Sequence, residues 1–92
     1  MKIQINIEYN SGEQVSVMAA PPEFAKWEKA TGHTISQAHD KIGVWDLMFL
    51  GYHAYKREAG GKPVKPFEIW QETISDISVG DEQNPKATNA EA

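Results

Sequence analysis

Three histidines are the side chains in this 92-residue chain that are best suited to metal binding or proton transfer. They are His33, His39 and His53, and no two of them stand four residues apart. Two imidazoles at an i, i+4 spacing share one face of a helix and can bind one zinc ion there. The chain contains no cysteine, which excludes thiolate metal sites, disulfides and a thiol nucleophile. The sequence therefore predicts neither a metal site nor a cofactor.

The other groups with catalytic potential are also incomplete. His39 and Asp40 are adjacent, but neighbours on a helix point in different directions. The five serines lie outside any nucleophile-elbow motif. Residues 60–62, Gly-Gly-Lys, lack the earlier glycine and the following Ser or Thr of a phosphate loop, and are typical of a helix end. We predict that the protein is not an enzyme and has no catalytic residues.

Segment 45–57, WDLMFLGYHAYKR, indicates binding instead of catalysis. Steps of three and four residues from its first tryptophan connect a largely aromatic stripe: Trp45, Met48, Phe49, Tyr52 and Tyr55. A second apolar face follows from the same spacing: Leu47, Leu50 and Ala54. A helix that is apolar on two faces must be covered on both, by its own chain or by a partner.

We predict that part of this helix faces a protein partner. The predicted partner-binding residues are four aromatic side chains and one lysine: Phe49, Tyr52, Tyr55, Lys56 and Trp70. Aromatic rings with a polar tip beside basic side chains are a common interface composition. Core packing is the alternative, and spacing alone favours it for the tryptophans: Trp27, Trp45 and Trp70. Self-association through the central helix is a further alternative.

Charge and hydropathy exclude several classes of partner. The formal net charge is −4 with the two signs mixed along the chain, which argues against a nucleic-acid binder with a basic face. The longest apolar run, residues 47–50, is far shorter than the roughly 20 residues that span a bilayer. No signal peptide is evident at the start of the sequence. We therefore expect no nucleic acid and no membrane among the partners.

The remaining segments predict the elements that must position this helix. Residues 2–8 and 15–18 alternate apolar and polar side chains on either side of the turn at 9–13, which predicts a β-hairpin. Helices are expected over 22–31, ended by Gly32, and over 44–58. A short helix or turn is expected over 34–40, capped by Thr34 or Ser36. The last expected helix begins near Pro66, with three large side chains on one face: Phe67, Trp70 and Ile74.

These elements predict a mainly α protein with a small β-hairpin, in the α+β class. The N-terminal antiparallel hairpin would pack on three to four short helices. We expect one small globular domain over residues 1–79, closed by Ile77 and Val79. Residues 80–92 have no large apolar side chain and predict a disordered, flexible tail.

The order of these segments resembles a known family. After the hairpin come EFAKWEKATG at 23–32, WDLMFLGYHAYKR at 45–57 and PFEIW at 66–70. Tail assembly chaperones of long-tailed, non-contractile bacteriophages have similar segments over a stretch like residues 1–79. Lys29 stands where that family often has arginine, and Gly51 interrupts the central helix. Glycine in a helix interior costs about 1 kcal/mol of stability relative to alanine. A glycine at this position can instead serve to let another part of the chain approach the helix closely.

The resemblance implies a non-catalytic role in virion assembly, in the host cytoplasm. Such chaperones bind the tape measure protein, keep it soluble and help recruit tail tube proteins, directly or through a longer form made by ribosomal frameshifting. Two alternatives remain: a small structural adaptor retained in the virion, and a small inhibitor of a host protein. If the resemblance holds, Tyr52→Ala with Tyr55→Ala is expected to keep the fold and lose client solubilisation.

Overall fold

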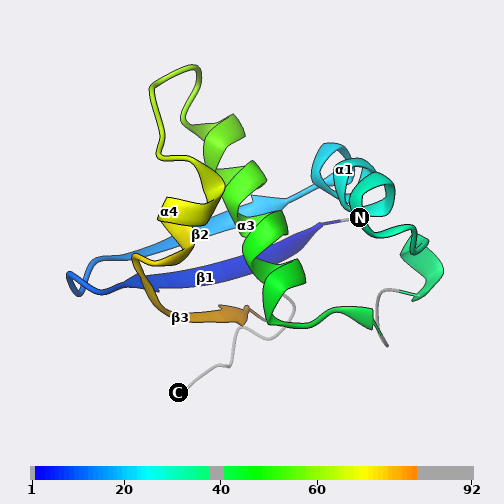
Figure 1. Ribbon diagram of the computed structural model, residues 1–92, viewed down its shortest axis with the longest axis horizontal. Coiled ribbons are helices and arrows are strands. Elements are labelled where there is room, and N and C mark those ends of the chain that lie inside the picture. Colours follow the sequence, from blue (N-terminus) through cyan, green and yellow to red (C-terminus); the bar gives the residue numbers. More distant parts are fainter. Residues whose placement is uncertain (1, 38–40, 81–92) are drawn as a thin grey trace.

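The computed structural model describes residues 2–37 and 41–80 (Figure 1). In chain order its elements are β1 (Ile3–Tyr9), β2 (Gln14–Ala19), α1 (Pro21–Thr31), the 3-10 turn η1 (Ile35–Gln37), α3 (Val44–Glu58), α4 (Phe67–Gln71) and β3 (Ile74–Val79). His39, Asp40 and, beyond Gly80, the predicted flexible tail lie outside the described residues. Helix α3 has the bounds that the sequence predicts.

The sheet has three antiparallel strands in the order β2-β1-β3. The N-terminal hairpin is present, with Ile5 opposite Val17, and β3 pairs with the other edge of β1, where Ile77 stands opposite Ile7. The prediction of a mainly α fold with only a hairpin is therefore wrong. The protein is a small α+β fold built on a three-stranded sheet.

The third strand forms because α4 ends early. Helix α4 stops at Gln71, and Ile74, which was expected on its apolar face, opens β3 instead. The amide of Asn10 donates to the Thr73 carbonyl at 2.8 Å, and its side chain donates to the Glu72 carbonyl at 2.9 Å. These bonds fasten the start of β3 to the hairpin turn, so the chain continues along β1.

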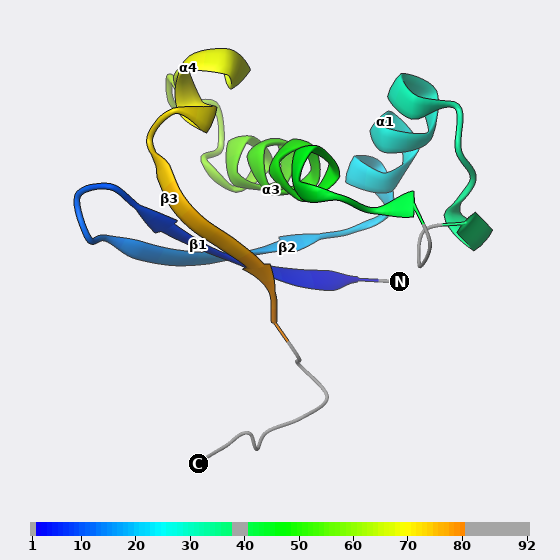
Figure 2. The same cartoon turned by 60° about the horizontal axis from the view of Figure 1, so that its bottom comes forward.

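All the helices lie on one face of the sheet, and α3 runs between α1 and α4 (Figure 2). Gly51 of α3 is buried on the sheet, where an added Cβ would lie 3.3 Å from Ile5 and 3.5 Å from Ile7. The glycine thus brings α3 close to the two isoleucines of β1, which offsets its cost within the helix. The opposite face of the sheet carries polar side chains: Gln4, Asn6, Glu8, Gln14, Ser16, Asp76 and Ser78.

The core lies between the sheet and the helices. Its fully or almost fully buried side chains are Ile5, Ile7, Val17, Ala19, Phe24, Trp27, Leu50, Tyr52, Ala54 and Trp70. Trp27 links α1 to α3, because its indole N–H donates to the Asp46 carboxylate at 2.8 Å. The second Asp46 oxygen accepts from the Gly43 amide at 2.7 Å, which caps the start of α3.

Candidate partner-binding surface

Helix α3 has a side that faces the sheet and a side that faces away from it. Leu50, Gly51 and Ala54 are buried on the sheet side. On the opposite side, Trp45, Phe49 and His53 follow each other at steps of four residues. At 3.6 residues per turn, this spacing places the three rings in one row along the helix. We call the side of α3 that carries this row the outward side.

Phe67 of α4 joins this row. The rings of Trp45 and Phe49 are stacked with centroids 5.1 Å apart, and His53 lies 4.5 Å from Phe49. Phe67 meets Trp45 and Phe49 edge to face, at 6.1 Å from each. We call these four side chains, Trp45, Phe49, His53 and Phe67, the aromatic ridge. Such geometries are favourable for aromatic pairs, so the ridge is a preformed surface.

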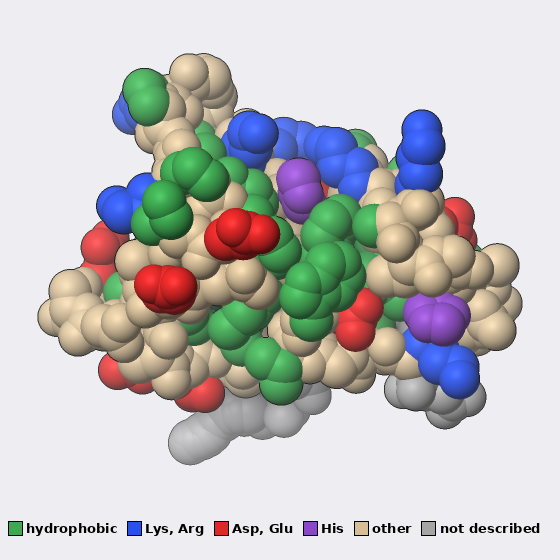
Figure 3. Space-filling view, in the orientation of Figure 1, with side chains coloured by type: hydrophobic (Ala, Val, Ile, Leu, Met, Phe, Trp, Pro, Cys, Tyr) green, Lys and Arg blue, Asp and Glu red, His purple; other side chains and the backbone are tan. Residues whose placement is uncertain are grey.

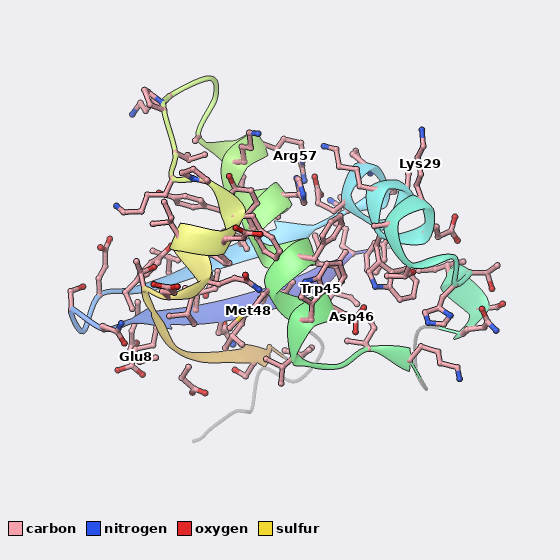
Figure 4. All side chains as sticks on the ribbon, viewed as in Figure 1. Glu8, Lys29, Trp45, Asp46, Met48 and Arg57 are labelled. Carbon is pink, nitrogen blue, oxygen red and sulfur yellow. The ribbon has the colours of Figure 1, made fainter. Side chains whose placement is uncertain are left out.

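The aromatic ridge is open to solvent. Trp45 is 44% exposed, and Phe49, His53 and Phe67 are half-buried. Hydrophobic side chains gather over α3 and α4 in the middle of this face (Figure 3). Trp45 lies on the first turns of α3 beside Asp46 and Met48, and Arg57 lies near the opposite end of the helix (Figure 4). Spacing alone favoured a core position for Trp45, and its exposure shows that this was wrong.

Two of the predicted partner-binding residues are buried. Tyr52 is only 5% exposed, and its hydroxyl donates to the carbonyl of Lys65 at 2.6 Å. Trp70 is 2% exposed, and its indole N–H donates to the Tyr9 hydroxyl at 3.2 Å. The Tyr52 and Trp70 rings lie 5.2 Å apart. These contacts hold α4 against α3, so both side chains pack the monomer rather than face solvent.

The other three predicted residues separate into two groups. Phe49 and Lys56 lie on the outward side of α3, and Lys56 is exposed with its Nζ 6.0 Å from the Tyr52 ring centroid. Tyr55 is half-buried, and its ring stacks on Trp70 at 6.4 Å. Because Tyr52 is buried, Tyr52→Ala with Tyr55→Ala would disturb packing as well as any surface. That pair of substitutions cannot separate folding from binding.

Three residues of the aromatic ridge were not among the predicted binding residues: Trp45, His53 and Phe67. The signal that could have found Trp45 and His53 is their i, i+4 spacing on either side of Phe49. The small residues Gly51 and Ala54 mark the opposite, sheet-facing side. Small side chains permit close packing, whereas a row of large rings away from them faces outward.

A buried ion pair fixes the end of α3 to the start of α1. Glu23 is fully buried, and the Arg57 guanidinium donates to its two oxygens at 2.7 and 2.8 Å. The Glu23 carboxylate also accepts from the Ala20 amide at 2.8 Å, which caps α1. Arg57 donates further to the Met18 carbonyl at 3.2 Å. Arg57 is thus committed to contacts within the chain.

The pKa of Glu23 reflects opposing causes. Burial, the largest, raises the pKa of this carboxyl. The hydrogen bonds from Arg57 and from the Ala20 amide, with the positive charges of Arg57 and Lys26, outweigh burial and bring the pKa below its usual value of 4.5. Glu23 is therefore ionised at neutral pH, and its role is structural.

The pKa of His53 is also lowered. Burial is the largest cause, the positive charges of Lys26 and Lys56 add to it, and the negative charge of Glu23 opposes it. Its imidazole is therefore neutral at pH 7 and serves as an aromatic surface beside Phe49. The aromatic ridge thus consists of uncharged rings with positive charge nearby.

The described part of the chain offers few other sites. Within residues 2–37 and 41–80, no three His, Asp or Glu side chains are grouped as a metal site would require. No helix in the same ranges is long and apolar enough to cross a membrane. Comparison with protein-family models, curated proteins and solved structures finds no match to this chain. The aromatic ridge and the sequence itself are therefore the features from which function can be inferred.

Proposed function

We propose that this protein is a non-catalytic assembly chaperone that captures apolar helical segments of a long client on its aromatic ridge. The observation that carries the proposal is the 44% exposure of Trp45 within a cluster of rings that residues 2–37 and 41–80 leave partly open to solvent. Exposed aromatic clusters rimmed by polar residues are typical of protein-binding surfaces. An amphipathic helix can lay its apolar face on such a surface.

The resemblance of residues 1–79 to tail assembly chaperones supports a specific client. That client is the tape measure protein of a long-tailed phage, bound in the host cytoplasm while the tail is assembled. Tail tube proteins would then replace the chaperone, recruited directly or through a frameshifted longer form. The small area of the ridge suits this role, because each copy must bind weakly enough to be displaced. Many copies along one client supply the avidity.

Co-expression tests the proposal. The chain is produced together with the long, coiled-coil-rich protein encoded just downstream, and the soluble fraction of that protein is measured. We expect the wild-type chain to raise the soluble fraction of that protein strongly. We also expect the chain to co-purify with it in several copies per client. Trp45→Ser with Phe49→Ser should abolish the effect, because it removes the stacked centre of the ridge. Trp45→Ser alone should give a smaller increase in the soluble fraction of the client than the wild type gives.

A matched control replaces exposed apolar residues away from the ridge. Ile35 is 36% exposed on η1 and Val79 is 53% exposed on β3. Ile35→Ser with Val79→Ser should solubilise the client as the wild type does. Circular dichroism must show that each variant is folded. If folded ridge and control variants behave alike, or the wild type has no effect, the proposal is wrong.

Particle composition distinguishes the two alternatives. A chaperone is expected to be absent from purified particles, whereas a virion adaptor would be retained there. An inhibitor of a host protein would be dispensable for particle assembly. Mass spectrometry of purified particles, combined with deletion of the gene, therefore decides among the three functions.

A further inference from the structure

Two exposed lysines, Lys26 and Lys56, lie beside the aromatic ridge on the side toward α1, and their charges describe its partner. We propose that the captured segment is an amphipathic helix with acidic side chains along one flank of its apolar stripe, placed against Lys26 and Lys56. The inference rests on the proposed function, because it takes the aromatic ridge as the site of capture. It adds the charge pattern by which a client segment is recognised.

Lys26 and Lys56 lie beside the His53 end of the aromatic ridge. Lys56 is exposed and follows His53 by three residues on α3, so the two share a side of the helix. Lys26 is exposed on α1, which stands next to α3 (Figure 2). Both ammonium groups are close enough to His53 to lower the pKa of its imidazole. The imidazole in turn contacts Phe49 at 4.5 Å.

Two other charged side chains near the ridge, Arg57 and Asp46, already have partners. Arg57 is paired with Glu23, and both oxygens of Asp46 accept hydrogen bonds, from Trp27 and Gly43. The Glu23–Arg57 contact is the one ion pair in residues 2–37 and 41–80. In that part of the chain the two lysines therefore remain available to a carboxylate from outside.

The opposite flank of the aromatic ridge carries charges of both signs, because Lys65 is exposed two residues before Phe67. Glu68 is exposed on α4, directly after Phe67 of the ridge. Figure 3 shows acidic and basic side chains beside α4, whereas lysine and arginine side chains lie along the end of α3 toward α1. A client helix lying over α3 would meet two lysines on the α1 side and charges of both signs on the α4 side. The acidic side chains of the client are therefore favoured on the α1 flank.

The net charge of the protein opposes the proposed preference for an acidic ligand. The whole chain carries −4, so non-specific electrostatic attraction would favour a basic ligand. A preference for an acidic ligand would have to come from the local pattern beside the ridge. Ionic pairing at an exposed site is modest and is screened by salt, which sets the expected size of the effect.

Three synthetic amphipathic peptides serve as probes. Each has about 18 residues, or five helical turns, with the same leucine stripe and no tryptophan. One flank of the stripe carries Glu in the first peptide, Gln in the second and Lys in the third. Dissociation constants are measured from the change in protein tryptophan fluorescence, to which the exposed Trp45 contributes. We expect the Glu peptide to bind about threefold to tenfold more tightly than the Gln peptide at low salt. High salt should remove the difference.

Charge reversal tests the assignment to the two lysines. Lys26→Glu with Lys56→Glu should remove the preference for the Glu peptide. The control, Lys2→Glu with Lys62→Glu, changes net charge equally at two exposed sites, the start of β1 and the loop before α4, and should keep the preference. Loss of the preference in the control would also overturn the assignment.

The outcomes separate this inference from the proposed function. If all three peptides bind equally, or the Lys peptide binds most tightly to the wild type, the charge inference is wrong and capture by the ridge stands. If no peptide binds, the proposed function falls with it. If sedimentation shows a dimer that Trp45→Ser dissociates, a second copy of the chain covers the ridge, and the inference is overturned.

Discussion

The two sides of α3 follow opposite rules although they belong to one fifteen-residue helix. The sheet side uses small or branched residues, with Gly51 brought close to Ile5. The outward side uses large rings, and Trp45 remains 44% exposed there. Hydrophobic content alone therefore does not separate core from interface. The size of the side chain and its angular position on the helix do.

The largest expected effect comes from truncating the sheet side. Leu50 is fully buried, so Leu50→Ala should lower the free energy of unfolding by about 3 kcal/mol through lost burial and the cavity left behind. Urea denaturation followed by circular dichroism measures this. The matched change on the outward side, Phe49→Ala, should cost clearly less because Phe49 is only half-buried. Equal losses would mean that the two sides of α3 do not differ as described.

A smaller effect is expected on the side of α3 that faces α1. The folded state lowers the pKa of Glu23, so the unfolded chain takes up this proton first as the pH falls. The stabilisation is therefore complete above pH 4.5 and is lost as the pH falls through the folded pKa. Glu23→Gln should cost about 2 kcal/mol at pH 7, toward the low end for charged hydrogen bonds because Arg57 is 44% exposed and can be hydrated.

Urea titrations between neutral and acidic pH check this prediction. The difference between Glu23→Gln and the wild type should shrink as the solution becomes more acidic. Glu68→Gln removes an exposed carboxylate of α4 and provides the control for lost negative charge. A variant whose stability depends on pH as the wild type's does would show that Glu23 contributes nothing to acid sensitivity.

The parts of the fold that could be predicted are those with local signals. Helix α3 has a continuous apolar pattern ended by glycines, and its bounds follow from that pattern alone. Gly32 adopts a φ of 80°, as the predicted C-terminal cap of α1 requires. The hairpin follows from alternation on both sides of a short turn. Each of these signals lies within a few residues of the feature it specifies.

Strand β3 could not be predicted in the same way. Ile74 and Ile77 stand three residues apart and fit a helix, whereas Ile77 and Val79 stand two apart and fit a strand. What decides between them is pairing with β1, at the other end of the chain. A contact between segments so distant in sequence leaves no local trace.

The candidate surface was only partly predictable for a related reason. Phe49 and Lys56 lie on the outward side of α3, but spacing could not show that α4 covers Tyr52. Tyr52 is covered because the chain between α3 and α4 folds back and brings the Lys65 carbonyl to the Tyr52 hydroxyl. A tyrosine at an interface and a tyrosine in the core have the same spacing in the sequence when the element that covers the core tyrosine is short.

The smallest expected effect tests the hydrogen bond that joins Tyr52 to the segment before α4. Tyr52→Phe removes one hydroxyl whose hydrogen bond to the Lys65 carbonyl is 2.6 Å long in a largely buried site. The loss should be about 1 kcal/mol, because Lys65 lies in an exposed segment where water can reach its carbonyl. Urea denaturation at pH 7 measures it, and Tyr55→Phe, on a half-buried ring, should change less. If Tyr52→Phe leaves stability unchanged, the hydrogen bond from Tyr52 does not contribute to holding the segment before α4 over the ring.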